Sequence, residues 1–191
     1  MKVFVYLGLI LLLFSCGEQQ KVETKTVEKS EFNTAKKHTQ ATVVLKKFEK
    51  DVENWKEHET LNDFIQKFQS ISPNNALSSS RELNTLVKSL NDSIKPVFLE
   101  SPSFNARVNL LYNETLRLYD MSSISSIKAE EVNLQVSKML HAYSSVNSRI
   151  NTTILQRNLE EELENPKTLR KPSLELNPKE IDLSLEKEGF I

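Results

Sequence analysis

The body of this chain contains no glycine at all between Glu18 and Glu188. Its three glycines are Gly8, Gly17 and Gly189, which lie near the two ends of the sequence. Tight hairpins and phosphate-binding loops depend on glycine, because glycine adopts positive φ without a steric cost. The sequence therefore disfavours all-β, Rossmann and P-loop folds, and it predicts an all-α protein.

Two stretches in the middle of the chain show the spacing of amphipathic helices. The apolar positions of the first stretch are Leu83, Leu86, Val87, Leu90 and Ile94. Ser79 can cap this helix, or the helix can begin earlier, at Asn74 or Asn75. The second helix is predicted to begin at Ser101-Pro102, an N-cap followed by proline at the first helical position.

Residues 36–71 carry two apolar stripes whose registers do not match. The first stripe ends at Trp55, and the second begins six residues later, at Leu61. The segment is therefore expected to form either one helix with a slipped stripe or two helices with a kink near His58. Trp55 itself is expected in the core or at the kink.

The last helix is predicted to be the longest, from a cap at Ser126 to a stop at Asn165-Pro166. About 38 helical residues would span roughly 57 Å, so this helix needs partners along its length or from another chain. Its core positions follow four- and three-residue steps and are Val132, Val136, Met139, Tyr143, Val146 and Ile150. It is also rich in amides, which we expect mostly on a solvated face, at Asn133, Gln135, Asn147, Asn151 and Gln156.

These patterns predict an all-α fold, an antiparallel bundle of about four helices over residues 36–164 with the last helix long. Residues 165–191 hold three prolines and are expected to form an irregular tail. Leucines and isoleucines alternate in that tail, so part of it could dock as a strand-like strip. Residues 16–35 have few apolar residues and alternating charge, which is typical of a flexible tether.

The first sixteen residues, MKVFVYLGLILLLFSC, combine a basic start with a short apolar segment that stops at Cys16. With Leu13 three residues and Ser15 one residue before that cysteine, the segment resembles the signal peptide of bacterial lipoproteins, in particular those of the Bacteroidota. The resemblance implies a signal peptide over residues 1–15 and lipid attachment at Cys16. An uncleaved membrane anchor and an ordinary signal cut elsewhere are the alternatives.

The resemblance also implies a location in the cell envelope. Acyl chains on Cys16 would hold the protein at a membrane, and the outer membrane of a Gram-negative bacterium is expected. The sequence does not distinguish the periplasmic face of that membrane from its surface face. The predicted tether of about 19 residues would reach on the order of 25 Å and would lift the helical domain off the lipid headgroups.

The charged and nucleophilic residues show no pattern typical of a catalytic, metal or cofactor site. The three histidines, His38, His58 and His141, do not occur at metal-ligand spacing with acids, and we expect each of them at the surface. With 25 Lys and Arg against 26 Asp and Glu, the chain lacks the basic excess of nucleic-acid binders. No catalytic residue is predicted, and Cys16 is the only site residue.

Three kinds of function follow from these patterns as hypotheses. The expected one is a non-enzymatic, lipid-anchored envelope protein that binds another envelope protein, or a second copy of itself, through the long last helix. The alternative is a helical-bundle protein that binds a small ligand or lipid. An enzyme is not expected.

Overall fold

The computed structural model describes residues 30–164 of the 191. The predicted signal peptide, Cys16, most of the predicted tether and the predicted tail all lie outside the described residues. Within residues 30–164 the fold is mostly helical, with one small two-stranded sheet. The predicted helical class is therefore confirmed.

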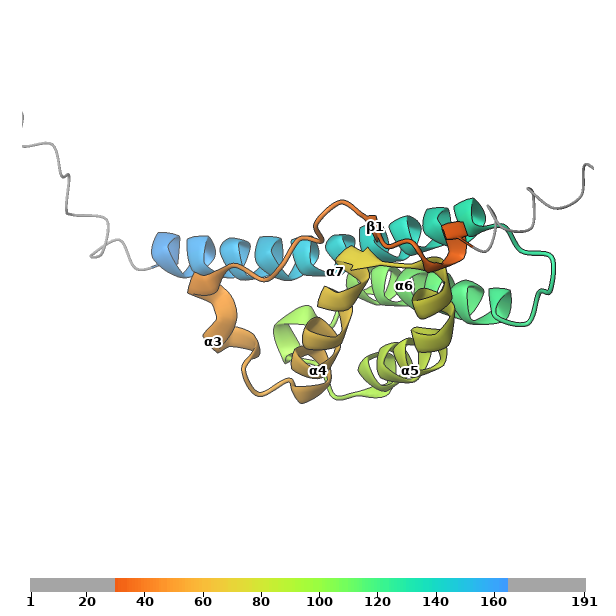
Figure 1. Ribbon diagram of the computed structural model, residues 1–191. Coiled ribbons are helices and arrows are strands. Elements are labelled where there is room, and N and C mark those ends of the chain that lie inside the picture. The colour runs from red at the N-terminus through yellow and green to blue at the C-terminus, as the bar shows by residue number, and fades with distance from the viewer. Residues whose placement is uncertain (1–29, 165–191) are drawn as a thin grey trace, which may run out of the picture.

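Three long helices make up most of the described chain (Figure 1). These are α5 (Pro73–Asp92), α6 (Pro102–Met121) and α7 (Ala129–Glu164). Helix α6 packs against both α5 and α7, and the shorter α4 (Lys56–Ile65) packs against α5. Helix α7 runs the length of the described region, as the prediction of a long last helix requires.

Short elements connect and flank these helices. Strand β1 (Lys36–Lys37) pairs antiparallel with β2 (Ser70–Ile71), with Lys36 opposite Ile71. The remaining elements are η1 (Lys46–Phe48), α3 (Glu49–Val52), η2 (Gln66–Gln69) and η3 (Val97–Leu99). Residues 30–33 are helical, and Phe32 packs against the edge of the core, so ordered contacts begin before residue 36.

Residues 36–71 match the predicted pair of helices only in part, because α3 and α4 are separated by a break at residues 53–55 but residues 36–45 are not helical. Residues 38–45, which we call the strap, are extended and run along α7 (Figure 1). Ala41 and Val44 are buried, as the apolar stripe required, but in an extended segment. Within residues 36–71 the first helical turn is η1, and Trp55 lies in the turn between α3 and α4 with 2% of its surface exposed.

The helix starts are set by local capping. Ser101 caps α6 as predicted, because its Oγ accepts a hydrogen bond from the Phe104 N–H at 3.2 Å. Helix α5 is capped instead by Ser72, with Pro73 in the first helical position, so Ser79 lies inside the helix. The Pro73 ring already has the helical φ value, which favours the earlier start.

Helix α7 begins at Ala129 and not after the predicted cap at Ser126. The Glu131 carboxylate accepts a hydrogen bond from the Lys128 N–H at 3.0 Å, which satisfies one free donor of the first turn. The acids Glu130 and Glu131 also favour a start here, because the N-terminus of a helix is partly positive.

The core lies where α4, α5, α6 and α7 meet. Its largest fully buried side chains come from all four helices and the 3₁₀ segments, and they include Leu61, Phe68, Leu83, Leu90, Phe104, Leu111, Leu118, Met139, Tyr143 and Ile150. Among the helices of residues 30–164, none has the length and apolar character that crossing a membrane requires.

Candidate functional site

His58 is buried, with 6% of its surface exposed, which corrects the prediction that every histidine lies at the surface. It occupies the first turn of α4, where the ring of Trp55 stacks on it with 5.2 Å between the centroids and 22° between the planes. This stacking shields one face of the imidazole from water. The ring edge points to α7.

On α7, the side chain of Asn147 connects His58 to the strap. Its Nδ2 donates to the backbone carbonyl of Thr42 at 2.8 Å, so its Oδ1 is the acceptor for His58 Nε2 at 2.9 Å. The His58 proton is therefore on Nε2, and Nδ1 carries the lone pair. One fully buried amide thus joins α4, α7 and the strap.

Two more side chains of α7 bind the backbone of the strap. Ser144 Oγ accepts from the Thr42 N–H at 3.0 Å. Asn151 binds twice, because its Oδ1 accepts from the Leu45 N–H at 2.9 Å and its Nδ2 donates to the Val43 carbonyl at 3.0 Å. Together with Asn147, these side chains replace the hydrogen bonds that a neighbouring strand would supply.

The strap and α7 run in the same direction, and their lengths match. At the first end, His38 Nδ1 hydrogen-bonds to Ser137 Oγ at 2.9 Å, and at the other end Leu45 bonds to Asn151. The extended residues 38–45 cover about 23 Å. The helical residues 137–151 cover about 21 Å. An extended chain therefore stays in register with polar residues spaced three, four or seven apart on one side of the helix.

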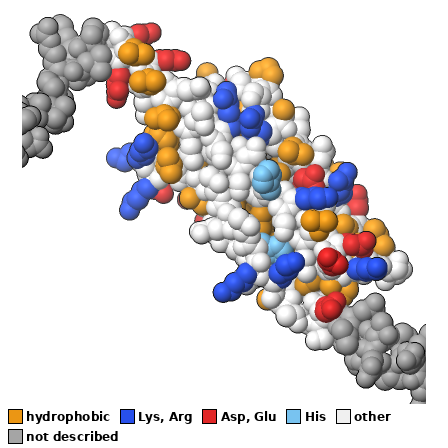
Figure 2. Space-filling view, turned by 90° about the horizontal axis from the view of Figure 1, so that it is seen from above, with side chains coloured by type: hydrophobic (Ala, Val, Ile, Leu, Met, Phe, Trp, Pro, Cys, Tyr) orange, Lys and Arg blue, Asp and Glu red, His pale blue; other side chains and the backbone are white. Residues whose placement is uncertain are grey.

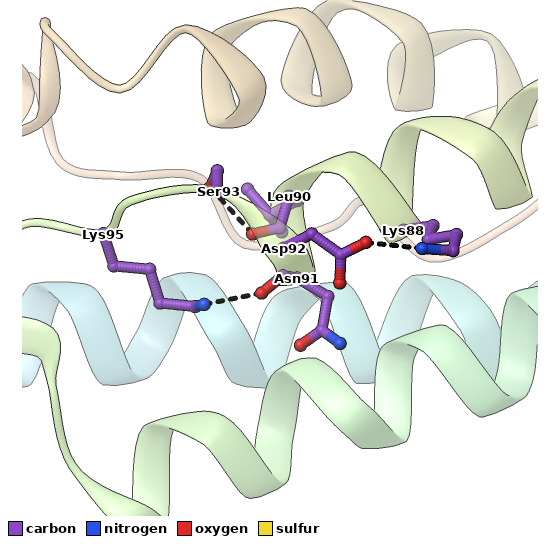
Figure 3. Close-up of polar contacts among 6 residues, drawn as sticks. All are labelled: Lys88, Leu90, Asn91, Asp92, Ser93 and Lys95. Atoms are coloured by element: carbon purple, nitrogen blue, oxygen red, sulfur yellow. Dashed lines mark hydrogen bonds and ion pairs between the residues drawn. The ribbon is translucent and has the colours of Figure 1, made fainter.

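The C-terminal end of α5 holds Trp55 in place. The Trp55 indole N–H donates to Ser93 Oγ at 2.8 Å, and the Ser93 hydroxyl donates to the Leu90 carbonyl at 2.8 Å. Beside it, Lys95 Nζ donates to the Asn91 carbonyl at 2.7 Å, so two of the last four carbonyls of α5 have side-chain partners (Figure 3). The position of His58 thus depends indirectly on the end of α5.

The protonation states follow from burial. Burial lowers the pKa of His58 below its ordinary value, and the hydrogen bond to Asn147 offsets part of that effect, so the imidazole is neutral at pH 7. Burial also raises the pKa of Tyr143 to about 12. Its hydroxyl stays protonated and donates to Asn62 Oδ1 at 2.9 Å. In their neutral forms, His58 and Tyr143 each hydrogen-bond to an amide oxygen, His58 to that of Asn147 and Tyr143 to that of Asn62.

A cleft of about 550 Å³ opens beside this network, between the strap, α3 and α4. Its volume is within the range of small-molecule sites, roughly 300–1,000 Å³. Val43, Val44 and Val52 supply apolar surface, and His58 and Asn62 are polar groups at its wall. The strap therefore forms part of the cleft as well as part of the fold.

Acidic side chains dominate the charge of this cleft. Its lining includes the four carboxylates of Glu49, Glu53, Glu59 and Asp63. Among the described residues that line it, the single Lys or Arg is Lys56, which pairs with Glu59 at 3.1 Å. The site therefore has a negative potential, which would attract a positively charged molecule rather than an anion.

The three histidines do not come together as one site. His38 is half-buried and bonds to Ser137, whose own hydroxyl donates to the Asn133 carbonyl at 3.1 Å. His141 is exposed, as predicted. Within residues 30–164, no three His, Cys, Asp or Glu side chains are placed to hold a metal ion. Cys16, the predicted lipid site, lies outside the described residues.

The amides of α7 are not mainly on a solvated face, which corrects the sequence prediction. Asn147 and Asn151 hold the strap, and buried Gln135 donates to the carbonyl and the carboxylate of Glu114 at 2.9 and 2.7 Å. Of the others, Gln156 is exposed as expected. The amide-rich composition was a usable signal, but its backbone partners on the strap were not visible in the sequence.

No family model, curated protein or solved structure matches this chain.

Asn147→Ala is expected to lower the free energy of unfolding by about 2–4 kcal/mol, because it leaves the Thr42 carbonyl and the His58 N–H without partners in the interior. Equilibrium urea unfolding measures this loss. Gln156→Ala removes an exposed amide from the same helix and should change the stability by about 0.5 kcal/mol or less. Equal losses of stability in the two variants would show that the Asn147 network, meaning its hydrogen bonds to His58 and Thr42, does not stabilise the fold more than an exposed amide does.

Proposed function

We propose that this chain is a lipid-anchored, non-enzymatic interaction protein of the bacterial cell envelope. In this proposal, α4, α5, α6 and α7 form a four-helix unit that presents the free end of α7 to another envelope protein. The observation that carries the proposal is an exposed apolar stripe on that end. The supporting sequence feature is the lipoprotein-like segment that ends at Cys16.

Within residues 30–164, helix α7 makes its last strong contacts with the rest of the fold at Arg157. The guanidinium pairs with Asp51 of α3 and lies 4.7 Å from the centre of the Phe98 ring in η3. Residues 159–164 are all exposed. The last turns of α7 thus extend beyond the helices that support it (Figure 1).

A row of leucines runs along α7 into this exposed end. Leu155, Leu159 and Leu163 recur every four residues and expose 54%, 54% and 63% of their surfaces. Residues four apart lie on one side of a helix, so the three form a continuous stripe, which we call the leucine stripe. Figure 2 shows hydrophobic side chains gathered towards this end of the molecule, with acidic side chains beside them.

The charge around the leucine stripe indicates the kind of partner. Glu160, Glu161, Glu162 and Glu164 surround it, and Arg157 is already paired with Asp51. Two copies that paired antiparallel through the stripe would bring these carboxylates together, and like charges across an interface are unfavourable. We therefore assign the stripe to a different protein, one with an apolar surface flanked by Lys or Arg.

The lipid anchor has a direct test. Cys16→Ser should abolish lipidation, so the unprocessed protein should accumulate and the lipid mass should be missing. Mass spectrometry of the membrane and soluble fractions measures both. If wild-type protein lacks the lipid mass and the variant stays in the membrane fraction unchanged, residues 1–16 form a plain membrane anchor and the proposal is wrong.

The partner surface can be tested by crosslinking in intact cells followed by purification of the full chain. Wild-type protein should give one discrete heteromeric product, and Leu155→Glu with Leu159→Glu should reduce it at least tenfold, because burying a charge in an apolar contact is costly. Leu134→Glu is the matched control, since Leu134 is 56% exposed on the same helix but far from the stripe.

Three results would count against the partner surface. These are recovery of monomer alone, a product made of two copies of this chain, and equal loss of product in Leu134→Glu. Monomer alone would mean that there is no partner protein. A product of two copies would mean self-association. Equal loss in Leu134→Glu would mean that the partner does not bind at the leucine stripe.

The acidic cleft supports a second candidate, the binding of a small, positively charged ligand. Native mass spectrometry of the protein purified from its own cells should then show a bound mass. Val43→Trp should fill the cleft and remove that mass, whereas Leu45→Trp should not, because Leu45 has similar exposure on the strap but does not line the cleft. Wild-type protein without any bound mass would remove this candidate.

A further inference from the structure

The leucine stripe has a second feature, which is the repeat distance of its side chains. Successive leucines are four helical residues apart, which corresponds to about 6 Å along the axis of α7. An extended chain places every second side chain on one face at steps of about 6.6 Å. A short extended segment with apolar residues at alternate positions would therefore fit the stripe residue for residue.

The sequence directly after α7 contains such a segment. Pro172, Leu174 and Leu176 are two residues apart, so in an extended conformation they share one face. Asn165-Pro166 follows the helix, and proline there cannot continue it. Residues 165–171 are long enough to reverse the chain and place Pro172 near Leu163.

The charges of the two segments are complementary. Lys167, Arg170 and Lys171 lie in the connecting residues, and a reversal of the chain would hold them close to the glutamates that end α7. The C-terminal end of a helix is partly negative and attracts cations, which adds to the same preference. A second copy lacks this advantage, since it would present its own glutamates to the stripe.

We propose that residues 172–176 pack against Leu155, Leu159 and Leu163 of the same chain and cover the leucine stripe until a partner displaces them. The packing itself is independent of the proposed function, whereas the displacement rests on it. The C-terminal segment then has the chemistry that we assign to the partner, basic residues next to an apolar face, and it competes for the same surface.

The test uses limited digestion of the full chain with a glutamyl endopeptidase. Glu175 lies between the two docking leucines, and Glu180 lies four residues beyond them and serves as an internal reference. The ratio of cleavage at Glu175 to cleavage at Glu180 is compared with the same ratio in a free peptide of residues 165–191. Docking should make the ratio about tenfold lower in the chain, because cleavage follows the population of the opened state.

Variants separate the stripe from other causes of protection. Leu159→Glu should return the ratio to that of the peptide, and Leu134→Glu should leave it unchanged. A wild-type ratio equal to that of the peptide would overturn the proposal. Protection that increases with protein concentration would also overturn it, since a second copy would then be the occupant.

The proposed function and the docking of residues 172–176 can fail independently of each other. Leu174→Ser with Leu176→Ser in the full chain should release the stripe and increase the crosslinked heteromeric product several-fold. If Glu175 is protected in the wild type but neither the wild type nor this double variant gives a crosslinked heteromeric product, the docking stands and the proposed function is removed. An unprotected Glu175 with a normal crosslinked product would remove only the docking.

Discussion

The fold depends on the way α7 satisfies the backbone of the strap. An extended segment on a helix surface has no strand beside it, and unpaired peptide groups in a buried place would be destabilising. Asn147, Ser144 and Asn151 supply the missing donors and acceptors from the helix. Because Asn147 also binds His58, the same amide fixes the first turn of α4.

Helix α7 therefore serves two surfaces with different chemistry. One side contributes Val136, Met139, Tyr143 and Ile150 to the apolar core, and the adjacent side carries the hydroxyls and amides that hold the strap. Exposed Leu134 and the leucine stripe belong to neither surface. This division explains why the helix is long. Most of its length, from Ala129 to Arg157, is used by its own fold, and its last turns extend beyond those contacts.

The two candidate sites differ in how they are built. The cleft beside His58 is formed by the strap, so its shape follows from the Asn147 network, and its carboxylates favour a cationic occupant. Leu159 and Leu163 of the leucine stripe lie beyond the Arg157 contacts with Asp51 and Phe98, and Leu155 lies just before them on the exposed side of α7, so the shape of the stripe depends mainly on α7 remaining helical. Changes to the network should therefore alter the cleft and leave the stripe intact.

Sequence alone determined the helical class, the start of α6 at Ser101-Pro102 and most core positions of α5 and α7, because glycine content, capping and apolar periodicity are local properties. Ile94 was predicted wrongly, because α5 ends at Asp92 and the Ile94 side chain is 94% exposed. Sequence alone also gave Cys16 as the only predicted site residue, and that prediction lies outside the described residues. It did not predict the strap, since Ala41 and Val44 have helical spacing and only their contacts with α7 make the segment extended. The burial of His58 depends on Asn147, 89 residues away. Tertiary structure decides these features. The amides of α7 bind backbone groups of the strap that would otherwise form hydrogen bonds within a helix of residues 38–45, and they can do so only when the two segments meet.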